Sequence, residues 1–465
     1  MELAALADVV GGDLADDADA ARTVDEVTID SRGARPGSLF VPLRGERADG
    51  HDFLDDAVGR GATGYLFEAR RPPAAHPGAV VVDDPADALL GLGAWVRDTI
   101  DPTVVAITGS SGKTTTKDLV AAAVGAGRRT VANPGSYNNE LGVPLTCCRL
   151  EADTEVLVAE VATRGVGHIA RLATILAPDI AVVTTVGASH LATLGDLDTV
   201  ARAKAELVQA LGPDGLAVLN ADDPRVAAMA GAVAGRVLTY GRGADADWRA
   251  DDVTLDELAR PAFSVRGRRV RLALPGEHNI GNALAALVVA DAVGVDLGAA
   301  AAAVESATVS RWRSELLRTP DGLVILNDAY NANPSSTRAA LATLASITTD
   351  GRRWAVLGHM AELGPGSDAA HEEIGRLAAR LGVDGLVVVG EAAAAIRAGA
   401  AAEGAYGEDA LLTAADPDGV VGLLEGRLRP GDVVLVKASR SVGLEGVADH
   451  LRAAGDGPPA GGHAS

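Results

Sequence analysis

Residues 104–117 constrain the fold of this chain more than any other segment. The apolar run Val104-Val105-Ala106-Ile107 is followed by Thr108-Gly109-Ser110-Ser111-Gly112-Lys113-Thr114-Thr115, and a helical apolar pattern begins at Leu119. A strand, a glycine-containing loop, Lys-Thr and a helix form the order that phosphate binding requires, because glycines let backbone N–H groups turn toward phosphate oxygens at a helix N-terminus. Lys113 can then reach the β- and γ-phosphates, and the Thr114 hydroxyl can ligate Mg²⁺.

This loop departs from the common form at one position. The strict P-loop spacing places a glycine at position 107, where this chain has Ile107, so the loop is shorter. A chance Gly-Lys-Thr turn is the alternative interpretation. The strand and the helix on either side favour the phosphate loop, and we expect Gly109, Ser110, Ser111, Gly112, Lys113, Thr114 and Thr115 to bind a nucleotide.

The apolar runs predict two open α/β units after a smaller mixed one. Continuous runs at 103–108, 156–159, 180–185 and 216–219, and again at 323–326, 354–357, 386–389 and 433–436, are typical of parallel strands covered on both faces by helices. At about 150 residues per domain, 465 residues allow about three domains. We expect a small mixed α/β domain at 1–84, a central α/β domain at 85–310 that carries a β-rich appendage at 242–275, a third α/β domain at 311–454, and a disordered tail at 455–465.

Charge and cysteine content exclude several classes of protein. The formal net charge is −22, which argues against a general binder of nucleic acid or of anionic membranes. Cys147 and Cys148 are adjacent and are the only cysteines, so neither a disulfide framework nor a zinc pattern is present. The apolar stretch at 283–303 is interrupted by Asp291 and Asp296, which favours a buried helix pair over a membrane span. We therefore expect a soluble cytoplasmic protein.

Three polar residues stand near the expected strand ends of the central region. Glu160 ends an apolar run, at the edge where ligands bind in open α/β sheets, and a carboxylate there suits Mg²⁺. His190 follows another strand and could ligate a metal or a phosphate. Lys204 lies in a helical segment at 199–211. The alternatives are a solvated acid for Glu160, a capping or surface residue for His190, and a solvated helix face for Lys204.

Four loops carry dense hydrogen-bonding groups. The turn at 133–139 ends in Asn138-Asn139 and could hold a ligand or be a plain turn. His278-Asn279 and Asn282 stand at a helix start, where capping is the alternative. Asp328-Ala329-Tyr330-Asn331-Ala332-Asn333-Pro334 follows the first strand of the third region. Lys437-Ala438-Ser439-Arg440-Ser441 follows its last strand and suits an anion, with a solvated basic turn as the alternative.

These segments together resemble the Mur ligases, the ATP-dependent amino-acid and peptide ligases of peptidoglycan precursor synthesis. The short phosphate loop, Asn138-Asn139, His278-Asn279 with Asn282 and the 328–334 segment each resemble a family motif. The resemblance covers nearly the whole chain and implies the three-domain Mur ligase architecture, with a P-loop ATPase domain in the centre and a Rossmann-like C-terminal domain. The 328–334 segment resembles the branch that adds D-alanyl-D-alanine to UDP-N-acetylmuramoyl-tripeptide.

The resemblance also implies roles for individual residues. Lys113 would stabilise the transferred phosphoryl group, Thr114 and Glu160 would hold one Mg²⁺, and His190 would lie beside a second. Lys204, if carbamylated, would be a metal ligand, and Arg313 would contact phosphate. Asn279, Asn282, Asn331 and Asn333 would line the ATP side, with Asp328 between ATP and dipeptide. The substrate-binding set would be Asp30, Ser31, Arg32, Gly45, Asp49, His51, Asn138, Asn139, Lys437, Ser439 and Arg440.

The sequence departs from the family pattern at several of these positions. Val161-Ala162 follows Glu160 where many relatives have x-Gly, His168 stands where an acid is usual, His359 replaces an aspartate and Ala438 replaces a glycine. These departures concern substrate contacts rather than the reaction class. The resemblance implies a monomer that converts ATP, UDP-N-acetylmuramoyl-tripeptide and D-alanyl-D-alanine through an acyl phosphate, with the third domain closing over the second at a hinge near 308–313. The alternatives are a sibling ligase for another amino acid and a non-catalytic nucleotide-binding regulator.

Overall fold

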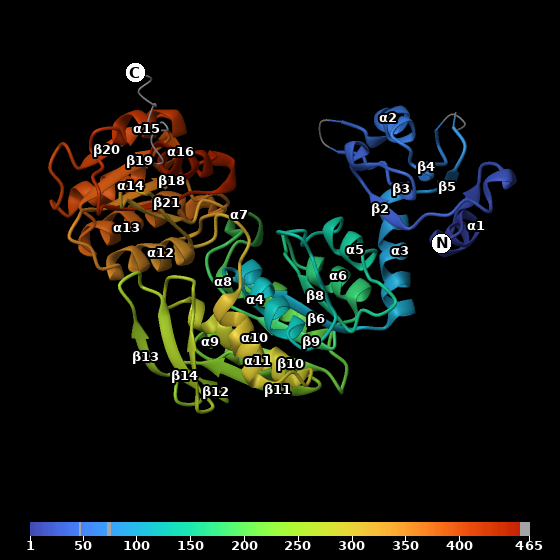
Figure 1. Ribbon diagram of the computed structural model, residues 1–465, viewed down its shortest axis with the longest axis horizontal. Helices are drawn as coiled ribbons and strands as arrows, with labels where there is room; N and C mark the ends of the chain where they lie inside the picture. The colour runs from blue at the N-terminus through green and yellow to red at the C-terminus, as the bar shows by residue number, and fades with distance from the viewer. Residues whose placement is uncertain (46–47, 72–75, 456–465) are drawn as a thin grey trace, which may run out of the picture.

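The computed structural model describes residues 1–45, 48–71 and 76–455, and their strands form four sheets. We call residues up to 84 the N-terminal part, residues 85–310 the central part and residues from 311 the C-terminal part. Figure 1 shows the N-terminal and C-terminal parts at opposite ends of the central part, with open space between them.

The N-terminal part is a five-stranded sheet with two helices. The strand order is β1-β5-β4-β3-β2, and only the β1–β5 pair is antiparallel. A long helix, α3 (Pro85–Ile100), leads from it to the central part, and the Asp84 carboxylate caps its first turn by accepting from Ala86 N at 2.7 Å. The other elements are β1 (Asp13–Leu14), β2 (Glu26–Thr28), β3 (Ser38–Phe40), β4 (Gly64–Glu68), β5 (Ala79–Val82), α1 (Leu3–Val10) and α2 (Leu54–Gly59).

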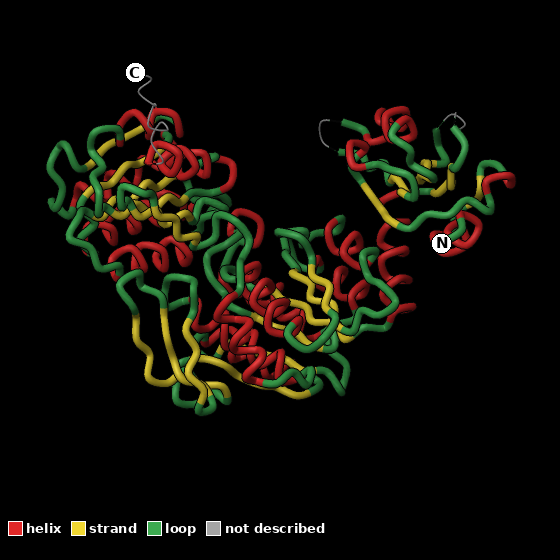
Figure 2. The backbone as a smooth tube through the Cα atoms, viewed as in Figure 1, coloured by secondary structure: helices red, strands yellow, loops and turns green. Residues whose placement is uncertain are grey.

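The central part contains a seven-stranded parallel sheet with the order β12-β11-β10-β9-β6-β8-β7. Helices cover both of its faces, as the continuous apolar runs predict (Figure 2). Its strands are β6 (Thr103–Thr108), β7 (Thr130–Ala132), β8 (Val156–Glu160), β9 (Ile180–Val183), β10 (Leu216–Asn220), β11 (Arg236–Gly241) and β12 (Trp248–Arg249). Its helices after α3 are α4 (Lys113–Gly125), α5 (Gly142–Cys147), α6 (His168–Leu176), α7 (Leu191–Leu194), α8 (Leu197–Gln209), α9 (Pro224–Ala227), α10 (Asn279–Ala292) and α11 (Leu297–Ser306).

The helix after the phosphate loop begins six residues earlier than the apolar pattern indicates. The sequence predicts its start at Leu119, whereas α4 begins at Lys113. Three threonines occupy this first turn, and their low helix propensity hides it from a reading of the sequence. The earlier start places the helix N-terminus directly at the loop.

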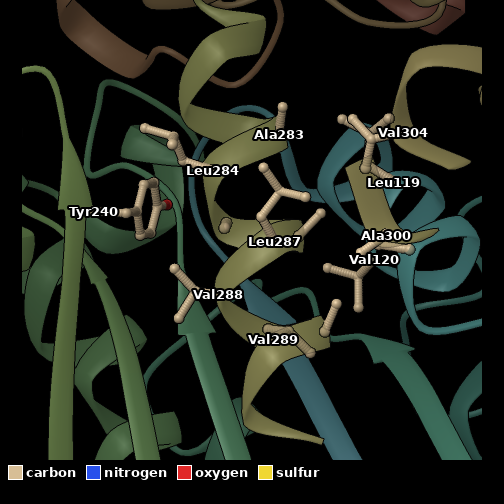
Figure 3. Packing of buried hydrophobic residues seen from close by; sticks show 14 of the residues in the cluster. Leu119, Val120, Tyr240, Ala283, Leu284, Leu287, Val288, Val289, Ala300 and Val304 are labelled. Atoms are coloured by element: carbon tan, nitrogen blue, oxygen red, sulfur yellow. The ribbon is translucent and has the colours of Figure 1, made fainter. Parts of the chain in front are cut away.

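The apolar stretch at 283–303 forms a buried helix pair, α10 and α11, as expected. Figure 3 shows Leu284, Leu287 and Val288 of α10 packed among Leu119, Val120 and Tyr240. Leu284, Leu287 and Val288 have no exposed surface, and burying each such side chain contributes about 1.5–3 kcal/mol. This core fixes the phosphate-loop helix against α10.

The β-rich appendage is a separate three-stranded antiparallel sheet. It consists of β13 (Asp251–Leu255), β14 (Pro261–Val265) and β15 (Arg268–Arg271). Phe263, Val265 and Val270 belong to the same core cluster as α10, so the appendage supports the central part from one side.

The C-terminal part is a six-stranded sheet with the order β16-β17-β21-β18-β19-β20, in which only β16 is antiparallel to its neighbour. Its strands are β16 (Glu315–Arg318), β17 (Val324–Asn327), β18 (Arg353–Gly358), β19 (Gly385–Val389), β20 (Leu411–Ala414) and β21 (Val433–Lys437). Its helices are α12 (Pro334–Ser346), α13 (Ser367–Arg380), α14 (Ala394–Ala402), α15 (Pro417–Leu424) and α16 (Glu445–Gly455).

The sequence does not predict the two edge strands of this sheet, β16 and β20. Both are half-exposed, so their apolar runs are too short to stand out. The start of the expected disordered tail, at residue 455, also differs, because Gly455 still belongs to α16. Residues 456–465 lie outside the described residues.

Candidate active site

The phosphate loop joins β6 to the N-terminus of α4 by residues 109–112. Gly112 has φ +81°, and a Cβ on Gly109 would lie 1.8 Å from Thr184 Oγ1, so both positions require glycine. Ile107 is fully buried inside β6. The strand therefore extends through the position where a longer loop would have its first glycine.

Lys113 lies at the head of α4 and points back over this loop. Its Nζ donates to Gly109 O at 2.9 Å. Burial lowers the pKa of Lys113, Arg313 lowers it further, and the Glu160 carboxylate opposes both. An anion that enters the loop would oppose the effect of burial and favour the charged form of Lys113.

Thr114 and Glu160 present oxygen atoms beside the loop. Each has 1% of its surface exposed, and Thr114 Oγ1 donates to Glu160 Oε2 at 2.6 Å. Asn138 Nδ2 holds the other carboxylate oxygen at 2.7 Å. The carboxylate is thus fixed at the carboxyl edge of the sheet, and the alternative of a solvated acid is wrong.

These two oxygen ligands suit a Mg²⁺ ion that also binds substrate phosphates and water. They do not form a site in which protein ligands alone hold the metal. Within the described ranges, no group of three or more His, Cys, Asp or Glu side chains is arranged to hold a metal ion. Mg²⁺ commonly uses one or two protein oxygens together with substrate phosphates and water. The Thr114–Glu160 pair beside the phosphate loop matches that pattern.

His190 and Lys204 flank the same region, and Lys204 does not lie on the solvated helix face that the sequence left open as an alternative. His190, at φ +55°, precedes α7 without capping it by a side-chain hydrogen bond, and its Nδ1 pairs with the Glu362 carboxylate of the C-terminal part. Burial lowers the pKa of His190, and Glu362 opposes that effect. Lys204 of α8 is 2% exposed, so it is not on a solvated face. Burial lowers its pKa well below the usual range, and Lys113 adds to that effect.

Two asparagines of α10 complete the central side. Asn279 Nδ2 donates to Pro275 O and Asn282 Nδ2 donates to Asn279 Oδ1, both at 2.8 Å. Asn282 Oδ1 accepts from Thr116 of the phosphate-loop helix at 3.1 Å. His278, at the N-cap position of α10, makes no side-chain capping bond. The Thr116–Asn282 hydrogen bond instead joins α4 to α10 at the site.

The C-terminal part contributes the ends of β17 and β21, which are neighbours in its sheet. Lys437 is 2% exposed. Its Nζ pairs with the Asp328 carboxylate and donates to Asn331 O at 2.9 Å. The alternative of a solvated basic turn is therefore wrong for Lys437. Ser439 Oγ accepts from Ala361 N at 2.8 Å, and Arg440 is exposed with its guanidinium 4.5 Å from the Trp312 ring centroid.

Two residues connect the C-terminal part to loops of the central part. Asn333 Nδ2 donates to Ser111 Oγ at 3.1 Å. Arg313 Nη2 donates to Ser136 Oγ at 2.9 Å, and its guanidinium lies 3.9 Å from the Tyr330 ring centroid. Arg313 Nε is buried and has no hydrogen-bond partner among the described residues, which leaves donor capacity for an anionic ligand.

A cavity of about 610 Å³ lies between these two parts. The predicted site residues that line it are Ser110, Ser111, Gly112, Lys113, Thr114, Thr115, Asn138, Asn139, Glu160, His190, Asn279, Asn282, Arg313, Asp328, Asn331, Asn333, Lys437, Ser439 and Arg440. Gly109 and Lys204, which are also predicted site residues, are not among the lining residues. The structure thus collects both halves of the predicted nucleotide site around one space.

The predicted substrate residues of the N-terminal part are not brought to this cavity. Asp30 pairs with Arg32 at 2.7 Å, which lowers the pKa of Asp30 to about 2. Asp49 accepts from His51 Nδ1 at 2.9 Å. These residues, with Ser31 and Gly45, lie in the part that stands apart in Figure 1.

Sequence reasoning missed several residues of the cavity wall. Glu362 lies four residues beyond the end of β18, at φ +63°, and lines the cavity together with Arg164 and Ser335. The strand-end rule that identifies Glu160 could have found Glu362, because β18 lies beside β21.

No helix among the described residues is long and apolar enough to cross a membrane.

Three family models match the chain. They are the Mur ligase family catalytic domain at residues 23–90, the Mur ligase middle domain at 107–290 and the Mur ligase glutamate ligase domain at 312–440. The UDP-N-acetylmuramoyl-tripeptide--D-alanyl-D-alanine ligase of Mycobacterium tuberculosis is 43% identical over 97% of each chain. The enzyme of the same name from Escherichia coli is 36% identical over 97% of this chain and 98% of its own.

Solved structures of MurF enzymes also match the chain over nearly its full length. A crystal structure of MurF from Acinetobacter baumannii has a TM-score of 0.85, 30% identity, and coverage of 96% of this chain and 98% of its own. The MurF ligase from Thermotoga maritima, solved in complex with ADP, has a TM-score of 0.80 and 29% identity over 93% of this chain and 98% of its own. From these matches and the architecture described above, the chain belongs to the Mur ligase family.

Proposed function

We propose that this chain ligates D-alanyl-D-alanine to UDP-N-acetylmuramoyl-tripeptide at the expense of ATP, yielding UDP-N-acetylmuramoyl-pentapeptide, ADP and phosphate. The observation that carries the proposal is the cavity in which the phosphate loop faces the Asp328–Lys437 pair and Asn333. The relatives named for this reaction cover 97% of the chain. The 328–334 segment, which favours this branch of the family, lies in the cavity wall.

The first chemical step is transfer of the γ-phosphoryl group to the terminal carboxylate of the tripeptide. The carboxylate oxygen attacks phosphorus, ADP leaves, and an acyl phosphate forms. Both reactants are anions, so positioning and charge neutralisation dominate this step. Lys113 of the central part and Arg313 of the C-terminal part, which has a free donor, supply positive charge to the cavity. Mg²⁺ held by Thr114 and Glu160 would offset further negative charge between the reactants.

The second step forms the amide bond. The amine of D-alanyl-D-alanine attacks the acyl carbon, inorganic phosphate leaves, and the nitrogen gives up a proton. Lys437, Ser439 and Arg440 lie on the C-terminal wall and suit the dipeptide carboxylate, while Asp328 holds Lys437 in place. Water must be kept from the acyl phosphate, because it would hydrolyse this intermediate before the amine attacks.

Lys204 fits the carbamylation that the family resemblance implies. Only a neutral amine adds carbon dioxide, and burial lowers the pKa of Lys204, so more of its amine is neutral. The product would be an anion that could join His190 as a second metal site.

We further propose domains at 1–84, 85–310 and 311–454, a monomeric state and a cytoplasmic location.

Phosphate release and product mass test the function. With ATP, Mg²⁺ and UDP-N-acetylmuramoyl-tripeptide, we expect phosphate release that requires D-alanyl-D-alanine, and a product heavier by the dipeptide minus water. Parallel reactions with diaminopimelate and lysine tripeptides identify the accepted third residue.

Lys113→Ala should lower turnover by about 10²-fold or more, because it removes a preorganised charge from the transferred group. Unchanged ligation by Lys113→Ala would contradict the assigned phosphate loop, and no release with either tripeptide would favour a sibling ligase.

A further inference from the structure

Lys117 and Asp118 form an ion pair in the second turn of α4, outside the cavity lining. Lys117 Nζ lies 2.8 Å from Asp118 Oδ1, and the two side chains are 3% and 14% exposed. Removing two charges from water costs several kcal/mol unless further hydrogen bonds satisfy them. Both side chains make such further hydrogen bonds, to backbone groups of two segments that reach the site.

Lys117 holds the loop at 133–138. Its Nζ donates to Asn133 O at 2.8 Å and to Gly135 O at 3.0 Å, so with Asp118 all three of its protons are used. This loop supplies Asn138, which holds Glu160, and Ser136, which accepts from Arg313. Lys117 thus acts on the site through the loop.

Asp118 holds the segment that joins the central and C-terminal parts. Its Oδ2 accepts from Ser310 N at 2.7 Å, three residues before Arg313. Trp312 and Ser314 have φ of +62° and +48°, a conformation that costs energy in residues other than glycine and persists only when neighbours hold it. The segment is therefore fixed at Ser310 by α4 and at Arg313 by Ser136.

We propose that Lys117 and Asp118 are positioning residues that set Arg313 against the phosphate-bearing reactants. The pair links the phosphate-loop helix to both anchors of the 310–313 segment. This inference rests on the proposed function and extends it to two residues outside the cavity. Loss of the pair would leave Lys113 and the glycine loop intact while displacing Arg313.

A double-mutant cycle between Asp118→Asn and Arg313→Ala tests the inference in the full-length chain. Asp118→Asn has one acceptor oxygen where the carboxylate uses two, so the side chain cannot serve both Ser310 N and Lys117 Nζ, and the link between the two anchors is broken. We expect kcat for ligation to fall about 10- to 100-fold in Asp118→Asn, because a displacement of about 1 Å can cost that much. ADP affinity by calorimetry should change less than about twofold, and the double variant should be no slower than Arg313→Ala alone.

Asp384→Asn is the matched control. The Asp384 carboxylate also accepts a backbone N–H, Arg353 N at 2.8 Å, but at the opposite end of β18 from the cavity. It should leave kcat unchanged. If Asp118→Asn fails to fold, Asp118→Glu retains the charge beside Lys117 while moving the carboxylate relative to Ser310, and it enters the same cycle.

Multiplicative losses in the double variant, or a fall in ADP affinity equal to the fall in kcat, would overturn the inference. Either result would mean that the pair supports the fold of the loop without acting through Arg313. An unaltered chain that binds ADP but does not ligate would instead overturn the proposed function.

Discussion

His371 is a buried imidazole with both ring nitrogens engaged. Nε2 accepts from Met360 N at 2.9 Å, so Nδ1 carries the proton and donates to Ser367 O at 2.8 Å. Burial lowers the pKa of His371, and the stacked ring of His359 lowers it further. The neutral ring thus holds the backbone that leads to Glu362 on the cavity wall.

Stability should therefore fall in acid partly through His371. Its folded-state pKa lies below the unfolded value of about 6.5, so below that pH the unfolded chain binds more protons, and stability falls as pH decreases. His371→Gln can still accept from Met360 N but does not titrate. Urea unfolding at pH 7.5 and 5.5 should show a smaller loss of unfolding free energy in His371→Gln than in the unaltered chain, with a difference of at most about 1.4 kcal/mol per pH unit. An identical loss in both would contradict this role.

Individual residues were predictable from the sequence where their function depends on local order. Lys113, Thr114 and Glu160 stand at strand and helix ends, and the same local rule placed them in one cavity wall. Lys204 was not separable from a solvated helix lysine, because its burial arises from packing between distant elements. The contact between Glu362 and His190 joins residues 172 positions apart, from two sheets, and no local pattern encodes it.

At the scale of elements, α12 shows how one residue can serve two purposes. Asn333 caps the helix by accepting from Ser336 N at 2.8 Å, Pro334 occupies the first turn, and the same side chain reaches Ser111 of the phosphate loop. The cap fixes the helix start, and that start lies at the cavity. The sequence predicted Asn333 as a site residue but not its capping bond.

Asn333→Ala should separate these roles when it is compared with Asp416→Ala. Asp416 caps α15 by accepting from Gly419 N at 2.9 Å, with Pro417 in the first turn, but it does not line the cavity. Each substitution should lower the unfolding free energy by about 1 kcal/mol, because each removes one N-cap. Only Asn333→Ala should also lower ligation, by about tenfold or more, since it alone breaks a contact to the phosphate loop. Equal activities in the two variants would contradict a role for Asn333 beyond capping.

At the scale of the whole molecule, the C-terminal part already contacts the central part, and closure of the third domain over the second during the reaction stays a prediction. Asn333 with Ser111, and Glu362 with His190, already join the C-terminal and central parts. It is the N-terminal part that stands away from the cavity (Figure 1). Relative placement of three separately packed cores depends on few contacts, so a sequence that predicts each core does not predict the angle between them.

The family resemblance implies that the N-terminal part binds the nucleotide end of the substrate, through residues such as Asp30 and Arg32. The peptide carboxylate at the other end reacts in the cavity, so one substrate molecule must reach both. We therefore expect the N-terminal part to approach when substrate binds. Small-angle scattering should show a smaller radius of gyration with UDP-N-acetylmuramoyl-tripeptide and a non-hydrolysable ATP analogue than without them. Spin labels should report a shorter distance between the N-terminal and central parts, while a pair across the central and C-terminal parts stays unchanged. Matching scattering curves with and without both ligands would show that the open arrangement already accepts the substrate, and shortening of the second label pair would instead favour closure of the C-terminal part.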